Sequence, residues 1–133
     1  MKQIFINLPV SDLKKSDGFY SAIGFKNNPQ FSDESARCMV WSEHIYVMIM
    51  THERFSSFTS KPIADTKTQL SALYSLSVGS VKEMNEIVSS GLSAGGNEPS
   101  EMKDHGFMQL RSLEDPDGFT WEIFFMDMSK LPQ

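Results

Sequence analysis

The chain has 133 residues, a length that suits one domain able to bury a hydrophobic core without disulfides or structural metals. Its composition, 40% hydrophobic and 22% charged, is typical of a globular protein and excludes a disordered chain. The net charge is −5 and the lysines and arginines do not cluster. This charge argues against nucleic acid and anionic membrane surfaces as partners.

The cysteine content and the apolar runs bear on location. Cys38 is the single cysteine, so no intramolecular disulfide can form. The apolar stretch within residues 4–10 is too short for a secretory signal. The longest apolar run, residues 45–50, has the length of a strand and not of a membrane span. We therefore expect a cytoplasmic protein without membrane contacts.

The first half of the chain opens with a strand and a helix. Residues 4–10 (IFINLPV) are apolar and β-prone, with Pro9 near the end, where a missing N–H matters least. Ser11 or Asp12 can cap a helix, and Gly24 suits the left-handed position that ends it. The helix is predicted from apolar residues at roughly helical spacing, which are Leu13, Phe19, Tyr20 and Ile23.

Extended segments follow this helix. Residues 36–41 and 45–51 flank a short turn and predict a hairpin, and a shorter strand is expected near 28–32. Residues 52–70 are rich in serine and threonine and weakly patterned. We interpret them as a crossover that carries a helical turn around Phe55–Phe58.

The second half repeats the order of strand, cap, helix and glycine. Residues 73–78 predict a strand, Ser80 and Glu83 can form a capping box, and Gly91 follows the helical stripe. The stripe consists of Val81, Met84, Ile87 and Val88.

The last hairpin carries the strongest turn signal. Residues 107–113 and 119–126 are β-rich and flank Asp-Pro-Asp-Gly at 115–118. If these four residues form the whole loop, Arg111 stands directly across from Glu122 on the neighbouring strand.

The two halves are related by a shift of 68 residues, which aligns Leu8 with Leu76 and Val10 with Val78. The repeated order indicates an internal duplication. We predict an α+β fold in which two tandem βαβββ modules form a half-open curved sheet or barrel with the helices outside. Residues 1–133 then form a single domain, with module 1 at about 1–54, the crossover at about 55–70 and module 2 at about 71–128.

This pattern resembles the glyoxalase/bleomycin-resistance/extradiol-dioxygenase superfamily, also called the vicinal-oxygen-chelate superfamily. Three stretches carry the resemblance: LPVSDLKKSDGFYSAIGF at 8–25, LSVGSVKEM at 76–84 and DPDGFTWEIF at 115–124. Together with the strand spacing they cover nearly the whole chain. INLPV near the start and DHGFM at 104–108 are particularly similar to uncharacterised lactoylglutathione-lyase-like proteins. The resemblance implies a cup that binds small molecules, and a homodimer.

The superfamily's metal-dependent members coordinate one divalent ion through four inward-facing strand positions. The resemblance places these positions at Phe5, Leu73, Met48 or Ile49, and Glu122. A catalytic metal site needs about three protein ligands and one open position. Phenylalanine and leucine have no donor atom, so we expect no metal and no other cofactor. Glu122 is the only ligand position that the sequence retains.

Four polar residues are candidates for contacting a ligand in the cup: Asn7, His105, Arg111 and Glu122. Glu122 lies on an apolar strand, where a buried carboxylate needs a partner, and Arg111 is the predicted partner. The pair is either structural or orients a polar group of a ligand. His105 precedes the last hairpin and is a candidate ligand-binding or acid–base group. Asn7 shares its strand face with Phe5.

The remaining reactive side chains are interpreted without a function. Cys38 lies in the middle of a strand and is expected to be a buried, inert thiol. His44, in a hairpin turn, is expected to be a solvated loop residue, and His52, at a strand end that can flank the mouth of the cup, is expected to have no functional role.

The leading hypothesis is a metal-free, small-molecule-binding member of the superfamily with a largely apolar cup rimmed by the four candidates. Two alternatives stay open. One is a divalent-metal-dependent lyase or dioxygenase with a rearranged site, and the other is a dimeric scaffold without a ligand. The sequence names neither a substrate nor a reaction, so it leaves open whether the protein is an enzyme.

Overall fold

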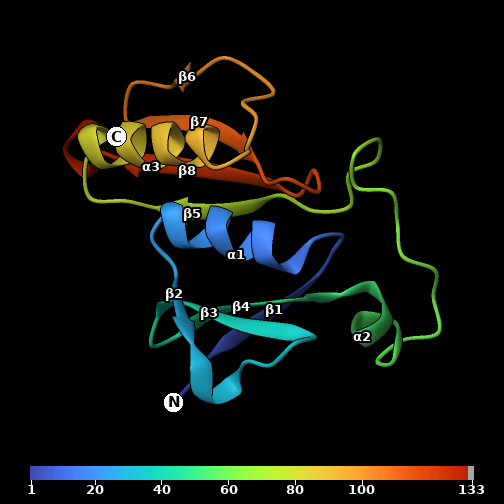
Figure 1. Cartoon of the computed structure of the whole chain (residues 1–133). Coiled ribbons are helices and arrows are strands. Elements are labelled where there is room, and N and C mark those ends of the chain that lie inside the picture. The colour runs from blue at the N-terminus through green and yellow to red at the C-terminus, as the bar shows by residue number, and fades with distance from the viewer. Residues whose placement is uncertain (132–133) are drawn as a thin grey trace. The chain divides into compact units, whose positions relative to one another are not determined.

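The structure is a computed structural model that describes residues 1–131 (Figure 1). Two compact units divide the chain, one spanning Met1–Asp65 and the other beginning at Thr66. Both units have the same order of strands and long helix. Among the described residues, no helix combines the length and the apolar character needed to cross a membrane. That the two units act as one domain stays a prediction.

The first unit is built on a four-stranded mixed sheet with the order β1-β4-β3-β2. Its elements are β1 (Ile4–Val10), α1 (Leu13–Ala22), β2 (Lys26–Asn28), a short 3-10 helix (Pro29–Phe31), β3 (Ala36–Ser42), β4 (Ile45–Thr51) and α2 (His52–Ser56). β1 and β4 are parallel, and the other neighbours are antiparallel.

Two expectations for the first unit need correction. The strand expected near 28–32 is wrong, because β2 ends at Asn28, where Pro29 lacks the N–H to continue the ladder and begins the 3-10 helix instead. The helical turn expected around Phe55–Phe58 begins earlier, at His52.

The second unit repeats this topology with the strand order β5-β8-β7-β6. Its elements are β5 (Tyr74–Ser77), α3 (Val81–Ser93), β6 (Lys103–Asp104), β7 (Met108–Glu114), β8 (Thr120–Met126) and a 3-10 helix (Met128–Lys130). The parallel pair is β5 with β8, the counterpart of β1 with β4. The predicted α+β fold of two tandem βαβββ modules is confirmed, and each sheet is open, with two edge strands.

Side-chain caps decide where the two long helices begin. The Asp12 carboxylate accepts a hydrogen bond from the backbone N–H of Lys15 at 3.1 Å and starts α1. The Ser80 hydroxyl accepts one from the N–H of Glu83 at 3.0 Å and starts α3. The Glu83 carboxylate accepts from the N–H of Gly79 at 2.9 Å, so the predicted capping box closes one residue earlier than in its standard form.

Glycine ends α1 as predicted but not α3. Gly24 follows α1 with a φ of +117°, the left-handed conformation expected of it. Gly91 does not end α3, because it is buried within the helix, which continues to Ser93. The left-handed residue after α3 is Gly95, with a φ of +99°.

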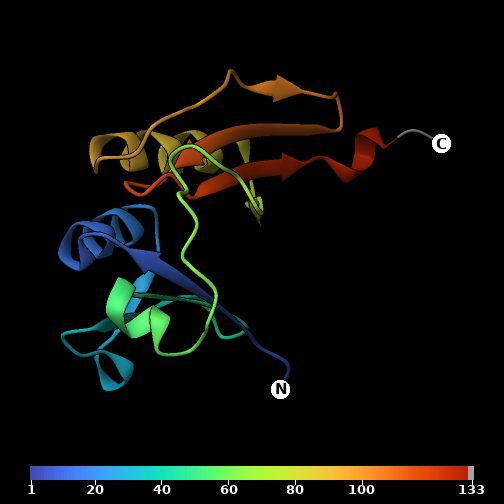
Figure 2. The same cartoon turned by 90° about the vertical axis from the view of Figure 1, so that its right-hand side faces the viewer.

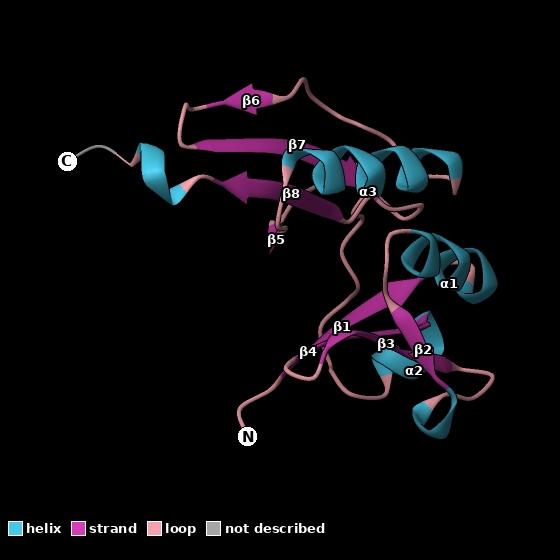
Figure 3. Cartoon of the chain, turned by 90° about the vertical axis from the view of Figure 1, so that its left-hand side faces the viewer, coloured by secondary structure: helices cyan, strands magenta, loops and turns pink. Residues whose placement is uncertain are grey.

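The core of each unit lies between its sheet and its long helix. In the first unit, an ion pair of 3.5 Å between Arg37 of β3 and Asp17 of α1 identifies the face that α1 covers. In the second unit α3 runs along β7 and β8 (Figure 3). The fully buried strand residues on these faces include Leu8, Met39, Val47, Ile49, Leu113, Trp121 and Ile123. Their removal from water is the main contribution to the stability of each unit.

The β7–β8 hairpin has a longer loop than the turn signal predicts. The backbone N–H of Asp115 donates to the carbonyl of Phe119 at 2.9 Å, and the Asp115 carboxylate accepts from the N–H groups of Asp117 and Phe119, both at 2.9 Å. The side chain thereby replaces backbone partners inside the turn. The first strand pair is Glu114 with Thr120, so the loop contains five residues and not four.

Gly118 lies where this loop meets the start of the second unit. The Thr66 hydroxyl donates to the carbonyl of Asp117 at 2.6 Å. A Cβ on Gly118 would lie 2.4 Å from the carbonyl oxygen of Thr66, and the residue has a φ of +88°. Both backbone conformation and space therefore require glycine at this position.

We predict that Gly118→Ala lowers the free energy of unfolding by at least about 2 kcal/mol, because it combines left-handed strain with a clash against backbone. Urea denaturation measures this loss. Gly106→Ala is the matched control, since Gly106 also has a positive φ, +82°, but nothing lies within 4 Å of an added Cβ. The control should lose only about 1 kcal/mol. Equal losses in the two variants would contradict the contact with Thr66.

Candidate functional site

Each sheet has a second face turned away from its long helix, here called the distal face. In the first unit Arg37 and its β4 partner Ile49 point to the α1 side. Because successive side chains of a strand point to opposite faces, Met48 and its β1 partner Asn7 point to the distal face. The distal face of the second unit carries Glu122, which pairs with Ser75 on β5 and Ser112 on β7.

A pocket of about 480 Å³ lies on the distal face of the first unit. Asn7 of β1, Phe55 of α2, and Phe58 and Thr59 from the segment after α2 line it, and we call it the Asn7 pocket. α2 packs against β1 and β4 (Figure 2). Its start is fixed by the Thr51 hydroxyl, which accepts from the N–H of Arg54 at 3.2 Å. The cap therefore holds the aromatic residues of the crossover beside β1.

The Asn7 pocket is lined by two aromatic rings, one carboxamide and one hydroxyl. The Asn7 Nδ2 donates to the carbonyl of Phe5 at 3.4 Å, which is long for such a bond. Within residues 1–131 the Asn7 Oδ1 has no protein donor, so it can accept from a ligand. The Thr59 Oγ1 accepts from the N–H of Lys61 at 3.2 Å and can donate its proton.

Aromatic surface continues from Asn7 along the distal face. Phe5 stacks on Tyr46 with ring centroids 4.4 Å apart and planes 9° from parallel, and about half of Phe5 is exposed. The Tyr46 hydroxyl donates to the carbonyl of Glu43 at 3.0 Å, which fixes the outer end of the stack. The first unit thus offers a ligand more apolar than polar contacts.

Glu122 has a different environment from the one predicted. The Ser75 hydroxyl donates to the Glu122 Oε1 at 2.9 Å, and the carboxylate is only half-buried. The strand opposite presents Ser112 and not Arg111. A solvated carboxylate with a hydroxyl partner needs no cation, so the charge-pair argument for Glu122 does not hold.

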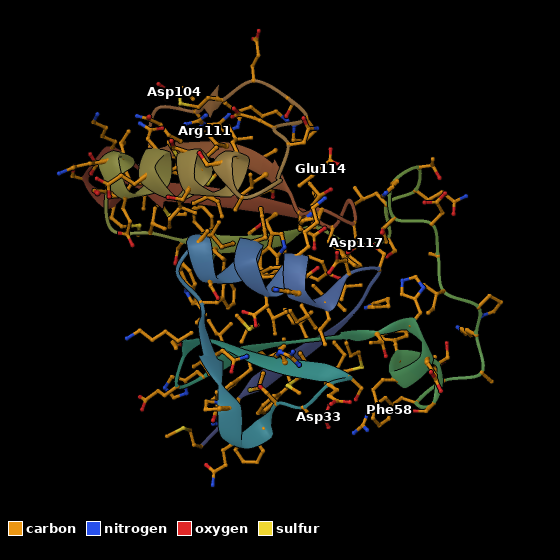
Figure 4. The ribbon with its side chains drawn as sticks, in the orientation of Figure 1. Asp33, Phe58, Asp104, Arg111, Glu114 and Asp117 are labelled. Carbon is orange, nitrogen blue, oxygen red and sulfur yellow. The ribbon has the colours of Figure 1, made fainter. Side chains whose placement is uncertain are left out.

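The predicted pairing of Arg111 with Glu122 is wrong. The five-residue loop shifts the register by one, so Arg111 pairs with Ile123 and points to the α3 side (Figure 4). There its Nε and Nη2 donate to the two oxygens of Glu98 at 2.9 and 2.8 Å, and its Nη1 donates to the Oδ1 of Asn85 at 3.0 Å. These hydrogen bonds lower the pKa of Glu98 and raise the pKa of Arg111.

A second pocket of about 570 Å³, here called the Arg111 groove, surrounds this ion pair. Its lining consists of Asn85, Glu98, Pro99, Ser100, Glu101, Met102 and Arg111. The guanidinium is engaged by protein on three nitrogens, so an anionic ligand would compete with Glu98 for it. The groove is therefore less suited to binding than the Asn7 pocket, although it is larger.

Among residues 1–131, the histidines and the cysteine line neither pocket. His105 is exposed in the turn before β7, where its backbone N–H donates to Met108 at 2.8 Å, and it lines neither pocket. His44 is exposed, as predicted, and His52 is exposed at the start of α2. Cys38 is buried as predicted, and burial raises the pKa of its thiol, which keeps it protonated and unreactive.

The residues present do not fit the metal site that the resemblance describes. Asn7 and Ser75 are related by the 68-residue shift, and their strand partners are Met48 and Glu122. Met48, and not Ile49, is therefore the counterpart of Glu122, and a thioether replaces the second carboxylate. Phe5 and Leu73 offer hydrocarbon only. Within residues 1–131 no three histidine, cysteine, aspartate or glutamate side chains are grouped so that they could hold a metal ion.

Sequence reasoning missed the aromatic side of the Asn7 pocket and the partners of Arg111. Phe55 and Phe58 were assigned to a helical turn, and the Thr51 cap was the available signal for where it begins. Glu98 lies in a loop without pattern, and its ion pair with Arg111 depends on the hairpin register.

Comparisons with known proteins agree on the fold. No family model and no curated protein matches the sequence. Among solved structures, a hypothetical protein from S. aureus is similar with a TM-score of 0.79 and 22% identity, covering 94% of each chain. A glyoxalase/bleomycin resistance protein/dioxygenase family enzyme from Burkholderia phytofirmans PsJN has a TM-score of 0.77 and 14% identity over 95% of this chain and 99% of its own. A bleomycin resistance determinant encoded on transposon Tn5 has a TM-score of 0.61 and 19% identity over 96% of this chain and 100% of its own.

At these identities the likeness shows the fold, which is the one that the sequence resemblance implies. The same fold occurs in a protein described as an enzyme and in one described as a resistance determinant. Fold alone therefore assigns no chemistry, and function has to be argued from the site.

The Arg111–Glu98 pair generates a pH prediction. Because the pKa of Glu98 is lowered in the folded state, its contribution to stability is complete above the unfolded pKa of about 4.3 and is lost as the pH falls through the folded pKa. Glu98→Gln should lower the free energy of unfolding at pH 7 by about 1 kcal/mol. It should also make this free energy decrease less steeply as the pH is lowered.

Urea denaturation between pH 3 and 7 measures both effects. Glu86→Gln is the control, because Glu86 pairs with Lys82 at 3.8 Å where both side chains are well exposed, and it should change little. A Glu98→Gln variant with wild-type stability across this range would contradict the assignment.

Proposed function

We propose that this protein, which has the fold of the glyoxalase/bleomycin-resistance/dioxygenase proteins, binds a small, partly apolar molecule in the Asn7 pocket without a metal ion. The observation that carries the proposal is the lining of that pocket. Two phenylalanine rings supply apolar contact, and the Asn7 carboxamide and the Thr59 hydroxyl supply polar contacts. Apolar walls with a few placed polar groups are typical of small-molecule sites, and a volume of about 480 Å³ lies in their usual range.

The chemistry of the former metal positions supports the same proposal. Phe5 and Met48 lie on the distal face beside Asn7, where hydrocarbon and thioether groups favour an apolar ligand over a hydrated cation. Leu73, another of these positions, is a hydrocarbon side chain in the second unit and is more than half exposed. Glu122 keeps a carboxylate on the distal face of the second unit, where it accepts a hydrogen bond from the Ser75 hydroxyl at 2.9 Å.

We further propose that the protein is a cytoplasmic homodimer, as the superfamily resemblance implies. The single, buried cysteine is compatible with a reducing compartment. Sedimentation equilibrium distinguishes a dimer from a monomer of 15.0 kDa.

The binding proposal predicts a saturable, one-to-one complex with at least one compound from a panel of octanoate, octanamide, benzoate and 2-naphthol. Asn7→Ala should weaken that complex about 3- to 10-fold, because it removes one hydrogen-bonding group. Isothermal titration calorimetry of protein treated with chelator measures both.

Asn85→Ala is the matched control, since it removes the same group from the Arg111 groove. It should leave binding unchanged. Absence of binding by the whole panel, or loss of binding in Asn85→Ala and not in Asn7→Ala, would overturn the proposal.

A further inference from the structure

Among residues 1–131, the side chains that line the Asn7 pocket carry no full charge. They are an amide, a hydroxyl and two phenyl rings. An ionised group placed there would lose water without gaining a counter-charge, which is costly. The lining itself therefore favours neutral polar groups, and the Arg54 guanidinium, 5.5 Å from the Phe58 ring centroid, is a charge beside the pocket and not part of the lining.

The two rings of the pocket differ in their exposure to solvent. Phe55 is half-buried in α2. Phe58, which follows the end of α2 (Figure 4), is 68% exposed. The backbone N–H of Phe58 donates to the carbonyl of Phe55 at 3.0 Å, so one tight turn links the two residues. Stacking of an aromatic ligand on the exposed Phe58 ring would bury apolar surface of both rings, which favours binding.

Arg54 holds the exposed ring in place. Its guanidinium carbon lies 5.5 Å from the centroid of the Phe58 ring, within the range of a cation–π contact. The Ser57 hydroxyl donates to the carbonyl of Arg54 at 2.6 Å and fixes the turn between the two side chains. The charge of Arg54 also acts weakly on Asp33, whose carboxylate is occupied by the backbone and hydroxyl of Ser35. Arg54 thus positions the ring and is not part of the pocket lining.

The Asn7 carboxamide defines the polar edge that a ligand needs. It offers an acceptor, Oδ1, and a donor, Nδ2, side by side. A lactam or a secondary cis-amide presents the complementary donor and acceptor in one plane and forms two hydrogen bonds with it. Thr59 adds a hydroxyl next to this position.

We propose, building on the proposed function, that the ligand of the Asn7 pocket is a neutral, planar aromatic or heteroaromatic molecule with a lactam- or amide-like edge. The aromatic part lies against Phe55 and Phe58, and the edge pairs with the carboxamide of Asn7. No covalent step is part of this proposal.

Four probes of matched size test the ligand class by isothermal titration calorimetry. Quinolin-2(1H)-one has the flat ring and the lactam edge, and N-methylquinolin-2-one has lost the donor. 2-Naphthoate has a flat ring with a charge, and octanamide has the amide without a ring. Quinolin-2(1H)-one should bind at least 10-fold more tightly than 2-naphthoate and about 3- to 10-fold more tightly than the other two.

Phe58→Leu should weaken the binding of quinolin-2(1H)-one about 3- to 10-fold, because it removes an aromatic ring. It should leave the affinity for octanamide nearly unchanged, because an apolar side chain remains. Phe31→Leu is the matched control, since Phe31 is 64% exposed in the same unit and lines neither pocket. Both positions are exposed, and circular dichroism verifies that both variants fold.

The outcomes separate the two proposals. If octanamide or 2-naphthoate binds as tightly as quinolin-2(1H)-one and loses affinity in Asn7→Ala, the pocket binds ligands but the proposed ligand class is overturned. Equal effects of Phe58→Leu and Phe31→Leu on quinolin-2(1H)-one overturn it as well. If none of the four probes binds, both the ligand class and the Asn7 pocket as a binding site fail.

Discussion

The length of one loop determines what the second sheet can do chemically. The carboxylate of Asp115 accepts hydrogen bonds from two N–H groups inside the turn, and the backbone pair of Asp115 with Phe119 closes a loop of five residues. Because side chains alternate between the faces of a strand, a change of one residue in the loop would exchange the faces relative to β7. The same turn is held by Thr66 through Asp117, so the register is fixed from both sides.

This register places the polar side chains of Glu122 and Arg111 on opposite faces of the second sheet. Glu122 lies on the distal face with a hydroxyl partner, and Arg111 lies on the helix side, where Glu98 and Asn85 satisfy it. The distal face of the second sheet therefore carries two half-exposed carboxylates, those of Glu114 and Glu122. In the first sheet the position that corresponds to Glu122 is Met48, which pairs with Asn7, and Asn7 lines a pocket together with Phe55 and Phe58. The two repeats have kept one backbone plan, while their distal faces differ: one is apolar and aromatic, and the other carries serine and glutamate.

The repeat was predictable from the sequence because local signals determine it. The helices follow from side-chain caps and apolar spacing, and the internal shift of 68 residues carries β1 onto β5 and the start of α1 onto the start of α3. The candidate site was less predictable. Asp-Pro-Asp-Gly marks a turn but does not say whether Phe119 belongs to the loop, and that single residue decided the partner of Arg111. Asn7 was identified, but Phe58 was not, because their proximity depends on how α2 packs on β1. Long-range packing of this kind leaves no periodic pattern in the sequence.

We propose that the protein works without a bound metal ion, because Phe5, Leu73 and Met48 offer hydrocarbon and thioether groups at the positions where the resemblance places metal donors. The metal content of the protein, measured by inductively coupled plasma mass spectrometry after expression in medium supplemented with manganese, iron, nickel and zinc, tests this. We expect well below one ion per chain for every metal, and the same result for Glu122→Gln. One tightly held ion per chain in the wild-type protein, lost in Glu122→Gln, would contradict this proposal.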